Sequence, residues 1–107
     1  MLRHEGSNRI SMVEGDYGLS LPIKINGITM SNEDKLNFYI KKIKDGEKVV
    51  DQTYDNIVDN TLYLTLSKEE SEKLPVGRYK YAIDWYKEDI FYCNIIKGIE
   101  FQVEDKI

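Results

Sequence analysis

The chain has 107 residues, the usual size of one domain and enough for a hydrophobic core without disulfides or a structural metal. Hydrophobic residues make up 41% and charged residues 32%, a composition that excludes an intrinsically disordered chain. The net charge is −4 and the lysines are scattered among acidic residues, so we expect no nucleic-acid partner.

The residues 1–8 are polar and predict a flexible amino-terminal segment before a domain that spans residues 9–104. The first fifteen residues lack the apolar stretch of a signal peptide, and no apolar run approaches the ~18 residues of a membrane-spanning helix. Cys93 is the only cysteine, so no intrachain disulfide can form, and we expect a small buried residue there. We therefore expect a cytoplasmic chain with no membrane partner, unless it leaves the cell inside a larger assembly.

Apolar and polar side chains alternate along most of the chain, a period of two that indicates β-strands. In chain order, the predicted strands are residues 10–13, 19–25, 35–44, 47–53, 61–66, 79–87 and 90–103. Pro22 in the second of these favours an edge strand or a bulge, because proline cannot donate to the hydrogen-bond ladder. About seven strands joined by short turns are typical of an antiparallel two-sheet sandwich.

Three places along the chain carry specific signals. Asp45-Gly46 predicts a hairpin turn, because this dipeptide tolerates positive φ. Ser67 and Glu70 have the spacing of a capping box and Pro75 stops a helix, so we expect one short helical turn between the fifth and sixth strands. Gly98 predicts a bulge or bend in the last strand.

Residues that could carry catalysis are sparse. His4, the only histidine, lies in the polar segment 1–8, so a catalytic triad or a histidine-based zinc site is not expected. Asp51, Asp55 and Asp59 recur every fourth residue but lack the spacing of an EF-hand loop. We predict a protein that is not an enzyme and has no metal, cofactor or small-molecule substrate.

The eight tyrosines are the most informative polar side chains. Some share the parity of the apolar residues in their strands and are predicted to lie in the core with the single tryptophan: Tyr79, Tyr81 and Trp85. Tyr39, Tyr63 and Tyr86 fall on the other parity. Because aromatic side chains often anchor interfaces, we predict that these three contact a partner.

Six segments follow one another in a recognisable order: residues 10–16, 19–25, 31–40, 64–67, 74–85 and 98–103. Their order, which covers nearly the whole chain, resembles small phage and prophage proteins of Gram-positive bacteria, including the amino-terminal domain of the siphophage baseplate upper protein. The resemblance implies an Ig-like sandwich that acts as a building block or adaptor in a tail or baseplate, or as a virion accessory. Such a protein would be made in the host bacterial cytoplasm and then join the virion.

The leading hypothesis is a non-catalytic phage or prophage structural protein that binds other phage structural proteins, or copies of itself, through an edge strand or exposed aromatic side chains. An alternative from another class is a carbohydrate-binding or adhesin-type module that recognises surface glycans through its tyrosines. Neighbouring genes for terminase, portal and tail proteins would favour the first. Quenching of aromatic fluorescence by a sugar would favour the second.

Overall fold

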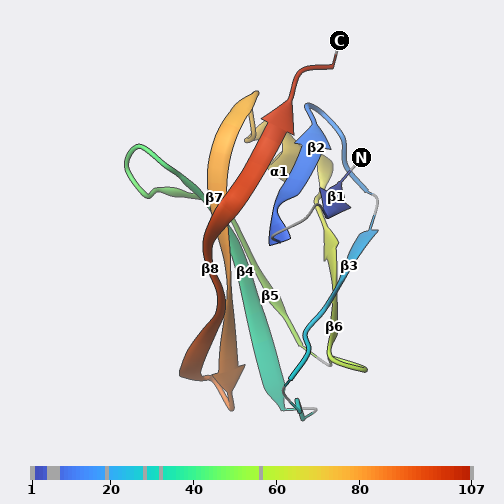
Figure 1. The fold of residues 1–107 in the computed structure, drawn as a ribbon, viewed down its shortest axis with the longest axis vertical. Helices are drawn as coiled ribbons and strands as arrows, with labels where there is room; N and C mark the ends of the chain where they lie inside the picture. Colours follow the sequence, from blue (N-terminus) through green and yellow to red (C-terminus); the bar gives the residue numbers. More distant parts are fainter. Residues whose placement is uncertain are drawn as a thin grey trace.

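Two β-sheets pack face to face in the computed structural model, which describes residues 2–4, 8–18, 20–27, 29–31, 33–55 and 57–106, without the side chains of Arg3 and His4 (Figure 1). In chain order the elements are β1 (Arg3–His4), β2 (Ile10–Val13), β3 (Ser20–Lys24), β4 (Asp34–Lys42), β5 (Lys48–Tyr54), β6 (Thr61–Thr65), α1 (Lys68–Glu72), β7 (Gly77–Lys87) and β8 (Ile90–Glu104). Within these described residues the larger sheet has the order β1-β2-β8-β7-β4-β5, and the smaller sheet pairs β3 with β6.

The predicted all-β sandwich of about seven strands with one short helical turn is confirmed. Its strand pairs are antiparallel, as expected, except that β2 pairs in parallel with the end of β8. Parallel neighbours need a long connection. In this chain, nearly all of the sequence connects β2 to the end of β8. No local sequence pattern indicates that these two strands pair.

The described part of the amino-terminal segment 1–8, which the sequence predicts to be flexible, contains a short strand. Leu2 is buried in the core, and the short strand β1 pairs with β2. Residues 1 and 5–7 lie outside the described part of the chain, as does the side chain of His4. The prediction that His4 belongs to no catalytic triad or zinc site therefore concerns a side chain outside the described part.

The core lies between the sheets and is formed by one parity of each strand, as the alternation predicts. The ring of Tyr81 on β7 packs against Phe38 and Phe101, with centroid separations of 5.6 and 6.4 Å. The predicted core positions are confirmed by exposed fractions of 7%, 1% and 5% for Tyr79, Tyr81 and Trp85. Cys93, by contrast, is only half-buried against this core.

The corner between β6 and β7 is held by side-chain hydrogen bonds. The Ser67 hydroxyl accepts from the Glu70 amide at 3.1 Å and the Glu70 carboxylate accepts from the Ser67 amide at 2.9 Å, which confirms the predicted capping box. After the helix, the Tyr79 hydroxyl donates to the carbonyl oxygen of Pro75 at 2.7 Å. A hydrogen bond from a tyrosine back to the preceding corner is a recurrent feature of immunoglobulin-type sandwiches.

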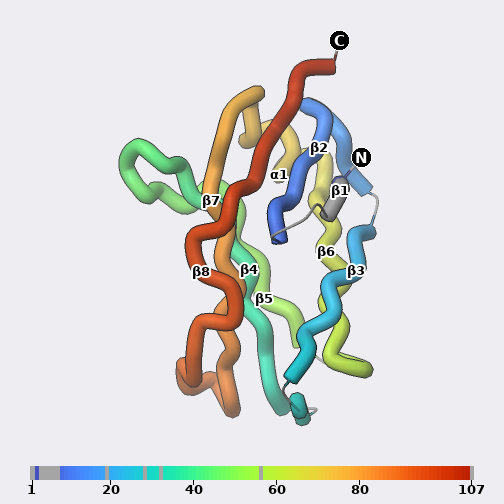
Figure 2. The backbone as a smooth tube through the Cα atoms, in the orientation of Figure 1, coloured from blue at the N-terminus to red at the C-terminus, as the bar shows by residue number. Residues whose placement is uncertain are grey.

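The predicted turn and bulge are also present. Gly46, in the β4–β5 connection, has φ of 72°, and Gly98 has φ of 64°. The ladder between β7 and β8 is irregular at three places, so residues 91–99 of β8 oppose residues 81–86 of β7. β8 nevertheless continues from the β7–β8 turn at one end of the molecule towards the other end (Figure 2).

Candidate protein-binding surface

The three tyrosines predicted to contact a partner do not form one cluster. Tyr39 on β4 and Tyr86 on β7 are half-buried on the outer face of the larger sheet. Tyr63 on β6 is 59% exposed and lies on the outer face of the smaller sheet. Because the outer faces of a sandwich point in opposite directions, Tyr63 cannot share a compact interface with the other two.

Tyr39 is enclosed by two lysines. The ammonium groups of Lys48 and Lys41 lie 4.3 and 5.1 Å from the centre of its ring. Burial, together with the negative charge of Asp84, raises the pKa of the Tyr39 hydroxyl. The ring is therefore held by cations over its surface, and its hydroxyl remains protonated at neutral pH.

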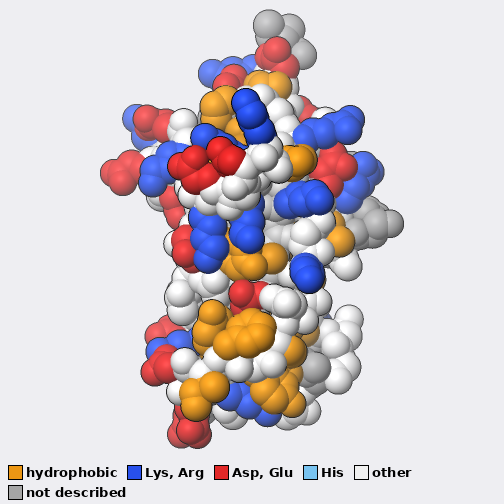
Figure 3. All heavy atoms as spheres, turned by 90° about the vertical axis from the view of Figure 1, so that its left-hand side faces the viewer, with side chains coloured by type: hydrophobic (Ala, Val, Ile, Leu, Met, Phe, Trp, Pro, Cys, Tyr) orange, Lys and Arg blue, Asp and Glu red, His pale blue; other side chains and the backbone are white. Residues whose placement is uncertain are grey.

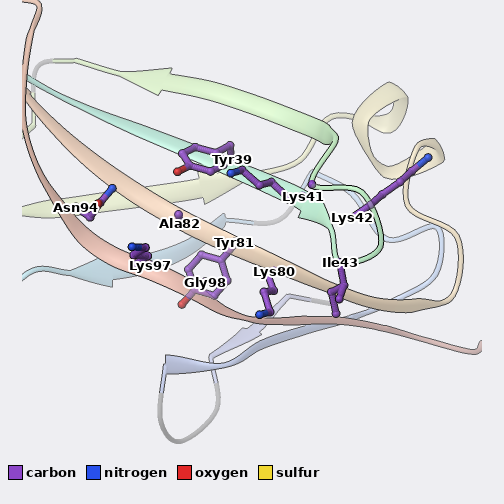
Figure 4. A pocket seen from close by; sticks show the side chains of 11 residues that line it. Tyr39, Lys41, Lys42, Ile43, Lys80, Tyr81, Ala82, Asn94, Lys97 and Gly98 are labelled. Atoms are coloured by element: carbon purple, nitrogen blue, oxygen red, sulfur yellow. The ribbon is translucent and has the colours of Figure 1, made fainter.

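A groove of about 330 Å³ extends from Tyr39 across the same face (Figure 4). Ala82 and Gly98 line it and contribute little or no side chain. Four lysines from three strands surround it: Lys41, Lys42, Lys80 and Lys97. This concentration of positive charge contrasts with the net charge of −4 for the chain, and suits a carboxylate-bearing segment of a protein.

The end of the β7–β8 hairpin carries the most concentrated exposed apolar surface on the larger sheet. Three consecutive residues, Ile90, Phe91 and Tyr92, are 71%, 51% and 55% exposed. Phe91 packs edge-on against Tyr86 at 5.7 Å, and Tyr92 against the core residue Trp85 at 4.8 Å. Hydrophobic side chains gather toward this end of the face, below a band of lysine and arginine (Figure 3).

These apolar residues lie on a free sheet edge. β2 pairs only with residues 101–104 of β8, so within the described chain no strand covers residues 90–100 on the side away from β7. We name residues 90–100 with their exposed side chains the β8 edge. An unpaired edge offers backbone donors and acceptors, and an apolar one also offers surface to bury, which together favour a protein partner.

A buried acidic residue at the start of β4, Asp34, has a structural role. Asp34 is 4% exposed, and its carboxylate accepts hydrogen bonds from the Ser31 amide at 3.0 Å, the Ser31 hydroxyl at 3.1 Å and the Trp85 indole at 3.0 Å. Burial raises the pKa of Asp34, but these hydrogen bonds outweigh it and lower the pKa below its ordinary value.

Neither a metal cluster nor a membrane-spanning helix occurs in the described part of the chain. Among its residues, no three histidine, cysteine or acidic side chains come together as a metal site would require. No helix within it has the length and apolar character needed to cross a membrane.

Two features of this surface are not predictable from the sequence pattern. The lysines of the groove come from separate strands, and only strand pairing brings them together. The run Ile90-Phe91-Tyr92 is recognisable as an apolar segment, but its exposure depends on where β2 ends. Comparisons with protein-family models, curated proteins and solved structures find no match to this chain.

Proposed function

We propose that this protein is a non-catalytic structural or adaptor component of a phage or prophage, in a tail, a baseplate or an accessory of the virion. It acts by binding other proteins through the β8 edge and the adjoining outer face of the larger sheet. The phage context comes from the resemblance described above, and the mode of action comes from the geometry of the surface.

The exposed apolar end of the β7–β8 hairpin is the observation that most strongly supports a protein-binding function. Ile90, Phe91 and Tyr92 are each at least half exposed to water. Grouping three such residues on an unpaired edge is unfavourable in an isolated domain, because the free energy falls when apolar surface is buried. A partner strand or loop placed against the β8 edge would bury this surface.

Glycan recognition remains the competing function, and the structure offers it less support. Sugar rings stack on open aromatic faces. Tyr39 has lysine ammonium groups over its ring, and Tyr86 is engaged with Phe91. A sugar titration followed by aromatic fluorescence tests this function directly.

The decisive experiment combines genomic context with binding. Tail and baseplate proteins encoded beside this gene would be purified, and their affinity for this protein measured by calorimetry. We expect at least one to bind. The double variant Ile90→Ser with Phe91→Ser should weaken that binding at least tenfold, since two apolar contacts are lost.

The matched control is Val58→Ser, which removes an exposed apolar side chain (74% exposed) from the β5–β6 connection. It should leave affinity within twofold, and circular dichroism should show that both variants are folded. Neighbouring genes unrelated to phage particles, or saturable binding of a glycan with no binding of any tail protein, would overturn the proposal.

A further inference from the structure

Three lysines lie side by side across the outer face of the larger sheet. Strand pairing places Lys41 on β4 directly opposite Lys48 on β5 on one side and Lys80 on β7 on the other. We name these three residues the lysine row. Neighbouring strands are about 4.8 Å apart, so the row spans roughly 10 Å. Lys97, on the adjoining strand β8, lines the same groove (Figure 4).

The lysine row is electrostatically unfavourable in the free chain. Like charges directly opposite each other in neighbouring strands repel. The Lys48 ammonium group lies 3.7 Å from the Asp51 carboxylate, which compensates one end of the row. Among the described residues, however, Lys41, Lys80 and Lys97 form no ion pair. The row therefore presents positive charge that acidic groups from outside the chain would neutralise.

Acidic residues limit the length of this positive patch. Glu100 on β8 lies opposite Lys80, but its carboxylate is ion-paired with Arg78 at 3.9 Å. Asp51 on β5 and Asp84 on β7 lie on the same face, closer to the hairpin end. A polymer with a negative charge on every unit, such as a nucleic acid, would run beyond the row onto these carboxylates. A short acidic segment fits within it.

The groove beside the lysine row also offers apolar surface. Ile43, in the β4–β5 connection, is more than half exposed and lines the groove. The ring of Tyr39 and the small side chain of Ala82 line it as well, opposite each other on β4 and β7. Apolar contacts beside charged ones are typical of surfaces that bind proteins. A side chain with an apolar part would pack here, and a phosphate polymer supplies none.

We propose that the lysine row and the groove beside it bind a short acidic segment of a partner protein, which carries several aspartate or glutamate residues and an apolar side chain. This inference rests on the proposed function, since it names the chemistry of the partner segment that contacts the outer face of the larger sheet. The carboxylates would lie over Lys41 and Lys80, and the apolar side chain beside Ile43. Exposed charge pairs are individually weak, so the row contributes mainly to selectivity and to the rate of encounter.

A peptide titration of the full chain, followed by nuclear magnetic resonance, tests this site. The probe is a short peptide of glutamate, glycine and leucine, and its matched control has glutamine in place of each glutamate. At low ionic strength we expect the acidic peptide to bind with a dissociation constant of about 0.5 mM. It should shift the backbone amide signals of Ala82 and Gly98 in the groove, whereas that of Tyr63, on the smaller sheet, should not move.

Removal of two positive charges from the groove tests its role. The double variant Lys80→Gln with Lys97→Gln should weaken binding of the acidic peptide at least fivefold, and so should an increase in salt from about 20 mM to about 300 mM. The matched control is Lys24→Gln with Lys68→Gln, which removes the same charge from exposed positions on β3 and α1. It should change the affinity less than twofold, and circular dichroism should show that both double variants are folded.

Equal shifts with the glutamate and glutamine peptides, or equal weakening by the two double variants, would overturn the acidic-segment site. The same conclusion would follow from the absence of any shift in the groove, or from binding of inorganic polyphosphate in place of the acidic peptide. Each of these results leaves the proposed function intact if a tail protein still binds at the hairpin end. Binding of the acidic peptide without binding of any tail protein would instead support the site and overturn the proposed function.

Discussion

At the scale of single residues, Asp34 shows how a buried charge is accommodated. Removing a carboxylate from water is unfavourable unless hydrogen-bond donors replace the lost solvent. Ser31 supplies two such donors and Trp85 a third. The carboxylate thereby joins the segment before β4 to the end of β7, directly beneath the exposed hairpin.

The lowered pKa of Asp34 predicts acid sensitivity. A carboxyl group whose pKa is lower in the folded chain than in the unfolded chain stabilises the fold above the unfolded value, 3.8. That stabilisation is lost as the pH falls through the folded pKa. Asp34→Asn should lower the free energy of unfolding at pH 7 by about 1–3 kcal/mol and reduce its decline below pH 4.

Urea unfolding measured at several pH values checks this prediction. The exposed Asp55→Asn is the control, because it removes a carboxylate without breaking a buried network. If the free energy of unfolding of Asp34→Asn declined below pH 4 as steeply as that of the wild type, other carboxyl groups would cause the acid sensitivity.

At the scale of elements, the short helix α1 depends on its capping and on contacts with the sheet. The five residues of α1 are too few for a helix that is stable alone. Glu70 completes the capping box and also accepts hydrogen bonds from the Gln52 amide on β5 at 2.9 Å. The helix is thus tied to the larger sheet at the corner that leads into β7.

Ser67→Ala should reduce the free energy of unfolding by about 1 kcal/mol, because the Glu70 amide loses its capping acceptor. Lys68→Ala, one residue further on and exposed, should change it by less than about 0.5 kcal/mol. Thermal and denaturant unfolding provide the comparison. Equal effects of the two substitutions would mean that the cap contributes nothing.

At the scale of the whole molecule, the two outer faces differ in what they offer a partner. The larger sheet combines the lysine groove, the apolar hairpin end and the free β8 edge. The smaller sheet consists of two short strands, β3 and β6, and its outer face offers the exposed side chain of Tyr63. A partner that needs a broad surface should therefore bind the larger sheet.

This asymmetry separates the three predicted contact tyrosines. Tyr86→Ala should weaken binding of a tail protein at least fivefold, because Tyr86 supports Phe91 at the hairpin end. Tyr63→Ala should leave the affinity within twofold, and Tyr39→Ala should have an effect only if the partner enters the lysine groove. Calorimetry with the same purified partner tests all three. A larger loss for Tyr63→Ala would place the interface on the smaller sheet.

Much of the fold was predictable because its signals are local. The alternation around Phe38 and Leu64, the capping pair Ser67 and Glu70, and the positive φ of Gly98 each depend on neighbouring residues along the chain. These patterns predict strands, turns and a two-sheet sandwich. They also predict which aromatic side chains enter the core.

The pairing order and the surface depended on contacts between residues far apart along the chain. β2 joins the end of β8 in parallel, and only this pairing shows where the β8 edge becomes free. Lys41, Lys80 and Lys97 meet because β4, β7 and β8 are neighbours, whereas Tyr63 is separated from Tyr39 because β6 belongs to the other sheet. Periodicity assigns a side chain to a face of its own strand, but the position of that face in the molecule is set by tertiary packing.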